Sequence, residues 1–135
     1  MRVLVCGGRD YTDRALVFQI LDLLKPTAVI TGGAEGADEY AHSWATAMEV
    51  ERPRFYADWK AFGKPAGPIR NQRMLVEGKP DLVVAFPGGR GTADLVRRAR
   101  KMGAPVLAVV PPIYWDKDKP SKGQKARPEV ELLTP

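Results

Sequence analysis

The sequence of 135 residues is the size of one domain, and its 44% hydrophobic content and mean hydropathy of −0.27 are typical of a globular chain with one core. A net charge of +5 favours an anionic partner, while one cysteine and one histidine exclude a disulfide framework and argue against a structural metal site. No apolar run reaches the roughly 18 residues of a membrane span, and the first residues lack a basic leader and a cleavage site, so we expect a cytoplasmic protein with no membrane partner.

Short β-branched runs alternate with segments of helical periodicity along the chain. The runs predict strands at residues 2–6, 27–31, 54–57, 81–86 and 105–110. Helical spacing predicts helices at about 12–24, 36–48, 68–77 and 92–102, separated from the strands by turns. We expect Thr12 to cap the first helix and Gly103 to end the last one. The buried face of the first helix is predicted to hold Leu16, Ile20, Leu23 and Leu24.

Strands separated by single helices imply right-handed crossovers and a parallel sheet covered on both faces. The pattern therefore predicts an α/β, Rossmann-like, doubly wound fold with a five-stranded parallel sheet in the order 3-2-1-4-5. Residues 1–110 form the predicted single domain. Residues 111–135 are rich in proline and begin with Ile113, Tyr114 and Trp115, so we expect a C-terminal arm that packs over the domain or a neighbour.

Glycine-rich turns follow three of the predicted strands, at 7–10, 31–36 and 87–92. In open parallel sheets, ligands bind outside the carboxyl ends of the strands, where the strand order reverses. Glycines let backbone N–H groups approach an anion, and each turn opens a helix whose N-terminus favours phosphate. The pattern predicts a phosphate-bearing ligand. The P-loop and the dinucleotide fingerprint are both absent, which argues against an ordinary NTPase or NAD dehydrogenase, and we expect no cofactor.

Four motifs in the order GGRDYTD, TGGAEGADEYAHSWA, GPIRNQRM and AFPGGRGTADLVRRA resemble the SLOG superfamily over about residues 2–110. They look like its short branch of YspA/YpsA-like proteins, the DUF2493 family. The superfamily also contains the Lonely-guy phosphoribohydrolases and the DNA-processing Smf proteins. The resemblance implies a ligand related to a nucleotide and a homodimer.

The Lonely-guy enzymes cleave a base from a nucleoside monophosphate with two motifs, R-K-x-x-M and P-G-G-x-G-T-x-x-E. By this resemblance, Arg70 takes the functional arginine position, and residues 87–92 match the start of the second motif. Leu95 stands where the catalytic glutamate is expected. Asp94 comes one residue early, about 100° away around a helix, so the catalytic residues are unknown.

Several polar residues lie near the predicted sheet edge. Arg70, Arg9 and Arg73 are candidates for phosphate contact, and Asn71 for reading a base or ribose edge. Asp10 could cap the first helix or contact a ribose, and the sequence leaves both roles open. Asp38 could interact with the helix dipole or contact the ligand, and both roles stay open as well. The predicted ligand-binding residues are Gly7, Gly8, Arg9, Asp10, Gly32, Gly33, Gly36, Asp38, Arg70, Asn71, Arg73, Pro87, Gly88, Gly89, Arg90, Gly91 and Thr92.

The remaining candidates are expected to be structural. Cys6 and Trp44 fall at core positions, and His42 has no carboxylate pattern beside it. Trp59 and Phe62 lie in a loop beside the glycine edge, where loop anchoring is favoured over stacking on a base.

The favoured function is binding of a nucleotide or nucleotide-derived phosphorylated ligand, as a sensor or sequestering protein. The first alternative is an enzyme that hydrolyses an N-glycosidic bond in a nucleotide, which Leu95 argues against. The second is binding of single-stranded nucleic acid. Five cations between Arg90 and Lys101 favour it, but aromatic residues are not interleaved with them as a stacking platform requires.

Overall fold

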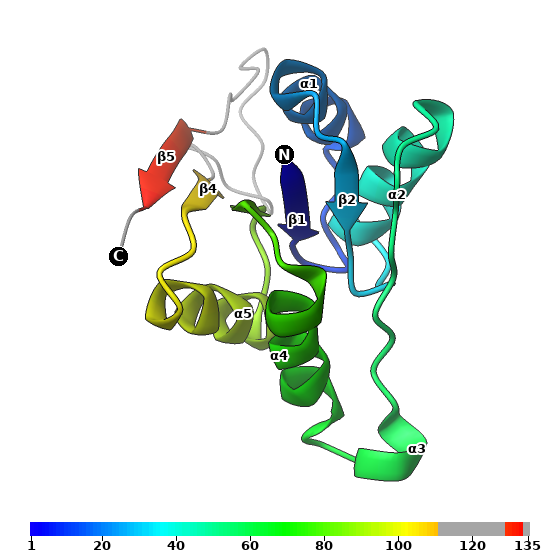
Figure 1. Ribbon diagram of the computed structural model, residues 1–135, viewed down its shortest axis with the longest axis vertical. Helices are drawn as coiled ribbons and strands as arrows, with labels where there is room; N and C mark the ends of the chain where they lie inside the picture. Colours follow the sequence, from blue (N-terminus) through cyan, green and yellow to red (C-terminus); the bar gives the residue numbers. More distant parts are fainter. Residues whose placement is uncertain (111–128, 134–135) are drawn as a thin grey trace, which may run out of the picture.

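A computed structural model of the chain describes residues 1–110 and 129–133. The fold has three layers, with a central sheet between two pairs of helices (Figure 1). Helices α1 (Arg14–Leu24) and α2 (Ala37–Ala47) cover one face, and α4 (Ala66–Gly78) and α5 (Arg90–Lys101) cover the other. The predicted α/β, Rossmann-like class is confirmed.

Four parallel strands form the body of the sheet in the order β2-β1-β3-β4. They are β1 (Arg2–Cys6), β2 (Ala28–Ile30), β3 (Leu82–Ala85) and β4 (Val106–Val110). The strand order reverses between β1 and β3, as predicted, because the crossover from β2 returns past β1 to its other side. The prediction of five parallel strands was wrong.

The predicted strand at residues 54–57 is reduced to isolated bridges at the sheet edge. Glu51 bridges to Ala28 and Arg54 bridges to Thr31, both in parallel register beside β2. Pro53 lies between the two bridges and has no N–H to donate, so no continuous ladder forms there. The segment still lies beside β2, where the predicted order had placed it.

The strand at the other edge, β5 (Glu129–Leu133), runs antiparallel to β4 and comes from the segment predicted as an arm. The proline-rich composition of residues 111–135 did not indicate a strand there. The residues at the start of the arm, Ile113, Tyr114 and Trp115, lie outside the described residues. The expected packing of the arm and its part in a homodimer therefore stay predictions. The division into a domain at 1–110 and an arm stays a prediction.

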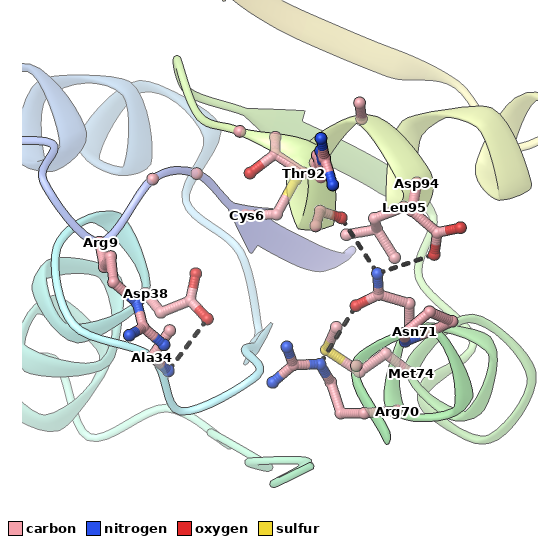
Figure 2. A pocket seen from close by; sticks show the side chains of 18 of the residues that line it. Cys6, Arg9, Ala34, Asp38, Arg70, Asn71, Met74, Thr92, Asp94 and Leu95 are labelled. Atoms are coloured by element: carbon pink, nitrogen blue, oxygen red, sulfur yellow. Dashed lines mark hydrogen bonds between the residues drawn. The ribbon is translucent and has the colours of Figure 1, made fainter. Parts of the chain in front are cut away.

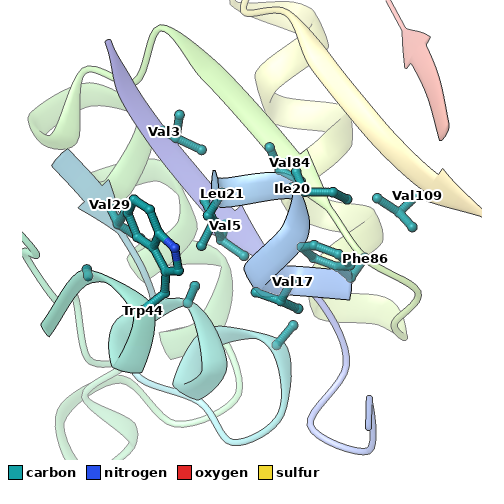
Figure 3. Close-up of a cluster of buried hydrophobic side chains, with 13 residues drawn as sticks. Val3, Val5, Val17, Ile20, Leu21, Val29, Trp44, Val84, Phe86 and Val109 are labelled. Carbon is teal, nitrogen blue, oxygen red and sulfur yellow. The ribbon is translucent and has the colours of Figure 1, made fainter. Parts of the chain in front are cut away.

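Alternation along β1 builds two separate cores. Val3 and Val5 face α1 and α2, where Phe86 and Trp44 complete the cluster shown in Figure 3. Leu4 and Cys6 point to the opposite face and pack against α4 and α5. The core positions predicted for Cys6 and Trp44 are confirmed, since both are buried. Every residue of β1 after Arg2 is therefore buried, as a covered parallel strand requires.

The N-cap of α1 lies one residue later in the chain than predicted. Asp13, and not Thr12, is the N-cap, and its Oδ1 accepts from the Leu16 N–H at 3.0 Å. The buried face holds Val17, Ile20 and Leu21, whereas the side chain of Leu23 is 83% exposed. Of the predicted face, Ile20 is buried and Leu16 and Leu24 pack against the core, so only Leu23 was wrong, while the buried Val17 and Leu21 were missed.

The segment at 58–67, which includes the loop expected around Trp59 and Phe62, contains a four-residue helix, α3 (Trp59–Phe62), capped by Asp58. It is followed by α4, which begins two residues before the predicted start. In the described part of the chain, no helix has the length and apolar character needed to cross a membrane.

Removing the cap of α1 tests where the helix begins. Asp13→Ala should lower the free energy of unfolding by about 1 kcal/mol, because the Leu16 N–H loses its acceptor. Thr12→Ala, the matched control, should stay within about 0.5 kcal/mol of wild type. Equal losses for both variants in urea unfolding would contradict the assignment of Asp13.

Candidate functional site

A cavity of about 710 Å³ opens at the carboxyl ends of β1 and β3. The turn after β1 and the start of α5 form one side, and α4 with α3 forms the other. Figure 2 shows Arg9 and Asp38 across the cavity from Arg70 and Asn71. It is lined by Cys6, Gly7, Gly8, Arg9, Ala34, Asp38, Trp59, Lys64, Gly67, Pro68, Arg70, Asn71, Met74, Gly89, Arg90, Gly91, Thr92, Ala93, Asp94, Leu95 and Arg97.

Close packing between turns explains part of the glycine pattern. The Gly8 N–H donates to the Pro87 carbonyl at 2.9 Å, which ties the turn after β1 to the turn after β3. A Cβ on Gly7 would lie 2.6 Å from the Ala37 Cβ, and one on Gly36 would collide with the Gly8 carbonyl oxygen. Gly36 also has a φ of +74°, which favours glycine. These glycines let the three turns meet.

Gly89 and Gly91 are different, because a Cβ built on either has no atom within 4 Å apart from the chain next to it and the backbone of α5. Gly89 is the N-cap of α5, with a φ of −99° that other residues adopt, and no side chain caps the helix. The first-turn N–H groups of α5 thus begin at an open surface that lines the cavity. Uncapped N–H groups and the helix dipole favour an anion at such a position.

Asn71 links α4 to the start of α5. Its side chain is 3% exposed, and its Nδ2 donates to the Gly91 carbonyl and to Asp94 Oδ2, both at 3.0 Å. Its Oδ1 accepts from the Arg70 Nε at 3.1 Å. Both amide hydrogens are therefore engaged within the protein, which leaves no N–H of Asn71 for the edge of a base.

Asp94 accepts hydrogen bonds from three side chains, one from α4 and two from α5. Besides Asn71, it accepts from Arg98 at 2.8 Å and from Arg97 at 2.6 Å. Burial acts to raise the pKa of Asp94, but the hydrogen bonds from Asn71 and Arg98 and the two arginine charges hold it below its ordinary value. Leu95, where the Lonely-guy motif has its glutamate, is 1% exposed and packs into the core. Asp94 therefore stays ionised and paired with arginines. The position of the Lonely-guy glutamate, Leu95, carries no carboxylate.

Arg70 has a larger structural part than its motif indicated. Its Nη1 donates to the Gly32 carbonyl at 2.6 Å and to the Phe55 carbonyl at 3.5 Å, so it ties α4 to the turn after β2. Burial lowers the pKa of Arg70, against the effect of the Asp38 charge, yet a guanidinium remains protonated throughout the neutral range. Arg70 lines the cavity with a charge that backbone carbonyls already bind.

Asp38 shapes the turn after β2 from the first turn of α2. It is 6% exposed, and its Oδ2 accepts from the Gly32 N–H at 3.1 Å and the Ala34 N–H at 3.3 Å. Burial raises the pKa of Asp38 to about 6, although these two bonds and the Arg70 charge act in the opposite direction. The same burial, with a smaller effect of Asp38, raises the pKa of the Cys6 thiol, so that Cys6 is a neutral thiol.

The cavity gathers ten of the predicted ligand-binding residues and leaves seven outside its lining. Arg73 is exposed, pairs with Glu77 at 2.7 Å and stands over the ring of Phe55. Asp10 is exposed beside Arg9 without lining the cavity. The other predicted residues outside the lining are Gly32, Gly33, Gly36, Pro87 and Gly88.

Sequence reasoning did not identify Lys64, Met74 and Arg97 as residues of the site, and it favoured a loop-anchoring role for Trp59. Trp59 and Lys64 come from the 58–67 segment, which has no periodicity to place them. Arg97 belongs to a charge run whose cations looked equivalent in the sequence. Among the side chains of residues 1–110, no group of three or more His, Cys, Asp or Glu residues is arranged to hold a metal ion.

The fold and the cavity define a Rossmann-like α/β protein with a cavity, lined in part by charged side chains, at the reversal of strand order. The chain belongs to the SLOG superfamily: residues 1–62 match the YspA, cpYpsA-related SLOG family. It is also 42% identical over 118 residues to the gene 61 protein of Mycobacterium phage D29, an alignment that covers 78% of this chain and 94% of the phage protein. The resemblance seen in the motifs is confirmed.

Two solved structures share the fold. DNA processing protein A (DprA) from Streptococcus pneumoniae superposes with a TM-score of 0.69 at 19% identity, covering 84% of this chain and 51% of DprA. The structural-genomics target TM1055 superposes with a TM-score of 0.57 at 19% identity, covering 78% of this chain and 72% of that protein. The chain thus spans about half the length of DprA, and both likenesses concern the fold alone.

The Asn71 link is testable by stability. Asn71→Ala should lower the free energy of unfolding by about 2–3 kcal/mol, because Asp94, Gly91 and Arg70 each lose a buried partner. Val76→Ala, at an exposed position of the same helix, should change the free energy of unfolding by less than about 0.5 kcal/mol. A value for Asn71→Ala that matches the control in urea unfolding would contradict this role.

The raised pKa of Asp38 predicts a pH dependence of stability. The folded state holds the proton up to about pH 6, whereas an unfolded aspartate releases it near pH 4. The native state therefore binds more protons between these values, and stability falls as the pH rises through them. Relative to Asp38→Asn, which cannot ionise, wild type should lose on the order of 2 kcal/mol between pH 4 and pH 7. Parallel pH profiles in urea unfolding would disprove the shift.

Proposed function

We propose that the chain binds a nucleotide or nucleotide-derived phosphorylated ligand in this cavity and acts as a sensor or sequestering protein. The observation that carries the proposal is the pair of open glycines at the uncapped start of α5, inside a cavity with excess positive charge. The cations that line it are Arg9, Lys64, Arg70, Arg90 and Arg97, against the carboxylates Asp38 and Asp94.

The phosphate is assigned to the start of α5. The space beside Gly89 and Gly91 is free of other atoms, and a helix of 12 residues presents its first N–H groups there. Thr92 adds a hydroxyl and Arg90 a guanidinium to the same lining. Charge-assisted hydrogen bonds of this kind are roughly twice as strong as neutral ones. The phosphate would therefore supply most of the orientation of the ligand.

The sugar is assigned to the side of the cavity formed by the turns after β1 and β2. Asp38 Oδ1 has no hydrogen-bond partner among the side chains and backbone of residues 1–110, while Oδ2 is engaged by the turn. A carboxylate oxygen in this position accepts a hydrogen bond from a ribose hydroxyl. This assignment gives Asp38 a ligand contact in addition to its part in the turn.

Binding without cleavage is favoured over N-glycosidic hydrolysis, because the two carboxylates that line the cavity, Asp94 and Asp38, already bind other groups of the protein. The glutamate position of the Lonely-guy motif is the buried Leu95, and Asp94 is paired with two arginines. Asp38 has one oxygen engaged in fixing the turn. Release of free base from a nucleoside monophosphate by the purified protein would overturn this part of the proposal.

Filling the open space at the start of α5 tests the phosphate site. Gly91→Leu or Gly89→Val should weaken binding of nucleoside monophosphates at least tenfold, because the added side chain occupies the anion position. The fold should persist, since neither glycine has a neighbour within 4 Å or a backbone conformation that requires glycine. Calorimetric titration with AMP, GMP, CMP and UMP measures the affinity, and circular dichroism reports the fold.

The matched control is Ala47→Leu, which adds bulk at an exposed position of α2 away from the cavity and should leave affinity unchanged. Mass spectrometry of small molecules released from the denatured protein gives an independent readout of ligand class. Unchanged nucleotide affinity in both glycine variants would remove the site from the start of α5.

A further inference from the structure

Trp59 is fixed at the rim of the cavity although most of its side chain is exposed. It begins α3, where Asp58 Oδ1 accepts from the Ala61 N–H at 3.0 Å and the Gly63 N–H donates to the Trp59 carbonyl at 2.9 Å. Its side chain is 57% exposed, yet it lines the cavity. The backbone of this residue is therefore held in place while a large aromatic surface is left uncovered.

The ring edge of Trp59 rests on the first turn of α4. A Cβ on Gly67 would lie 3.3 Å from the Trp59 Cη2, so a larger residue there would push the ring away. Gly67 is buried, and Pro68 next to it also lines the cavity. The glycine thus allows the indole to lie close against α4, which restricts its orientation at the mouth of the cavity.

The side of α4 that faces the cavity offers few groups that read the edge of a base. Both amide hydrogens of Asn71 are engaged by Gly91 and Asp94. The Arg70 Nη1 and Nε are engaged by Gly32 and Asn71, so that Nη2 is the Arg70 donor left for a ligand among the contacts of residues 1–110. The nearby lining from Met74, Pro68 and Leu95 is apolar. This side of the cavity suits a flat, apolar face better than a pattern of donors and acceptors.

From these contacts we infer that Trp59 is the stacking platform for the base of the ligand, so that the ligand class is a nucleoside phosphate recognised through the face of its base. The inference rests on the proposed function, which assigns the phosphate to the start of α5. Stacking on an aromatic side chain tolerates any base and is strongest for the larger rings. AMP and GMP should therefore bind with affinities within a few-fold of each other, and both more tightly than UMP.

Phe62 provides a matched control on the same short helix. It is 52% exposed, similar to Trp59, but it does not line the cavity. Removing its ring changes the aromatic surface of α3 by a comparable amount without touching the inferred platform. Ribose 5-phosphate provides the second control, because it keeps the sugar and phosphate of AMP and lacks the base.

The experiment titrates wild type, Trp59→Leu, Trp59→Phe and Phe62→Leu with AMP and with ribose 5-phosphate by calorimetry. Trp59→Leu should weaken AMP about tenfold or more and leave ribose 5-phosphate unchanged. Trp59→Phe should recover much of the AMP affinity, and Phe62→Leu should bind both ligands as wild type does. In a Trp115→Phe background, AMP should also quench tryptophan fluorescence when Trp59 is present and not when it is replaced by Phe, because the remaining Trp44 is buried away from the cavity.

Each contrary result has a distinct meaning. Unchanged AMP affinity in Trp59→Leu, or equal losses for AMP and ribose 5-phosphate, would overturn the platform and leave the phosphate site standing. A strong preference between AMP and GMP would overturn recognition through the base face, because it requires contacts to the base edge. Failure of wild type to bind either ligand would overturn the proposed function together with the inference.

Discussion

The hydrogen bonds of the Asn71 amide hold the two walls of the cavity in one arrangement. A buried amide must satisfy its donors, and Asn71 does so with the Gly91 carbonyl and Asp94, both on α5. Asp94 in turn binds Arg97 and Arg98, so the charges along one side of α5 are ordered by the same contact. Through its Oδ1, Asn71 also orients Arg70, whose Nη1 reaches the turn after β2. One side chain thus connects α4, α5 and the β2 turn, and leaves the first turn of α5 open toward the cavity.

The glycines around this network fall into two groups, according to the space that a Cβ would have. A Cβ on Gly7, Gly36 or Gly88 would lie under 3.0 Å from another atom, so these glycines allow the close approach that brings the three turns to one edge of the sheet. Gly89 and Gly91 have empty space where a Cβ would be. A glycine whose neighbours would collide with a Cβ is explained by packing, whereas a glycine beside empty space in a cavity is explained by a ligand that needs the space. This distinction is the reason why the proposed phosphate site is placed at the start of α5.

Local patterns predicted most of the fold, because the sheet is built from strongly apolar runs. Residues 2–6 and 105–110 read as strands on composition alone, and the order of the four parallel strands followed from the crossovers. Weaker signals failed: Pro53 interrupted the third strand, and β5 lay in a proline-rich segment. Of the candidate site, the glycine turns and Arg70 were visible as motifs. Asn71 was also named as a candidate, but its link between the two helices was not predicted, nor was the position of Trp59 in the lining, since both depend on contacts between α3, α4 and α5 that no periodicity encodes.

The structure also changes which cations are available to an anion. The motif singled out Arg70, but its guanidinium already binds two backbone carbonyls, and Arg97 already binds Asp94. Within residues 1–110, Arg9, Lys64, Arg70 and Arg90 line the cavity without an ion-pair partner, and of these four only Arg70 donates hydrogen bonds to backbone carbonyls. Arg90 is the first residue of α5, so its charge and the uncapped N–H groups of that helix favour an anion at the same place. In the proposed complex, Arg70 would help to fix the walls, and the start of α5 and the cations without an ion-pair partner would attract the phosphate.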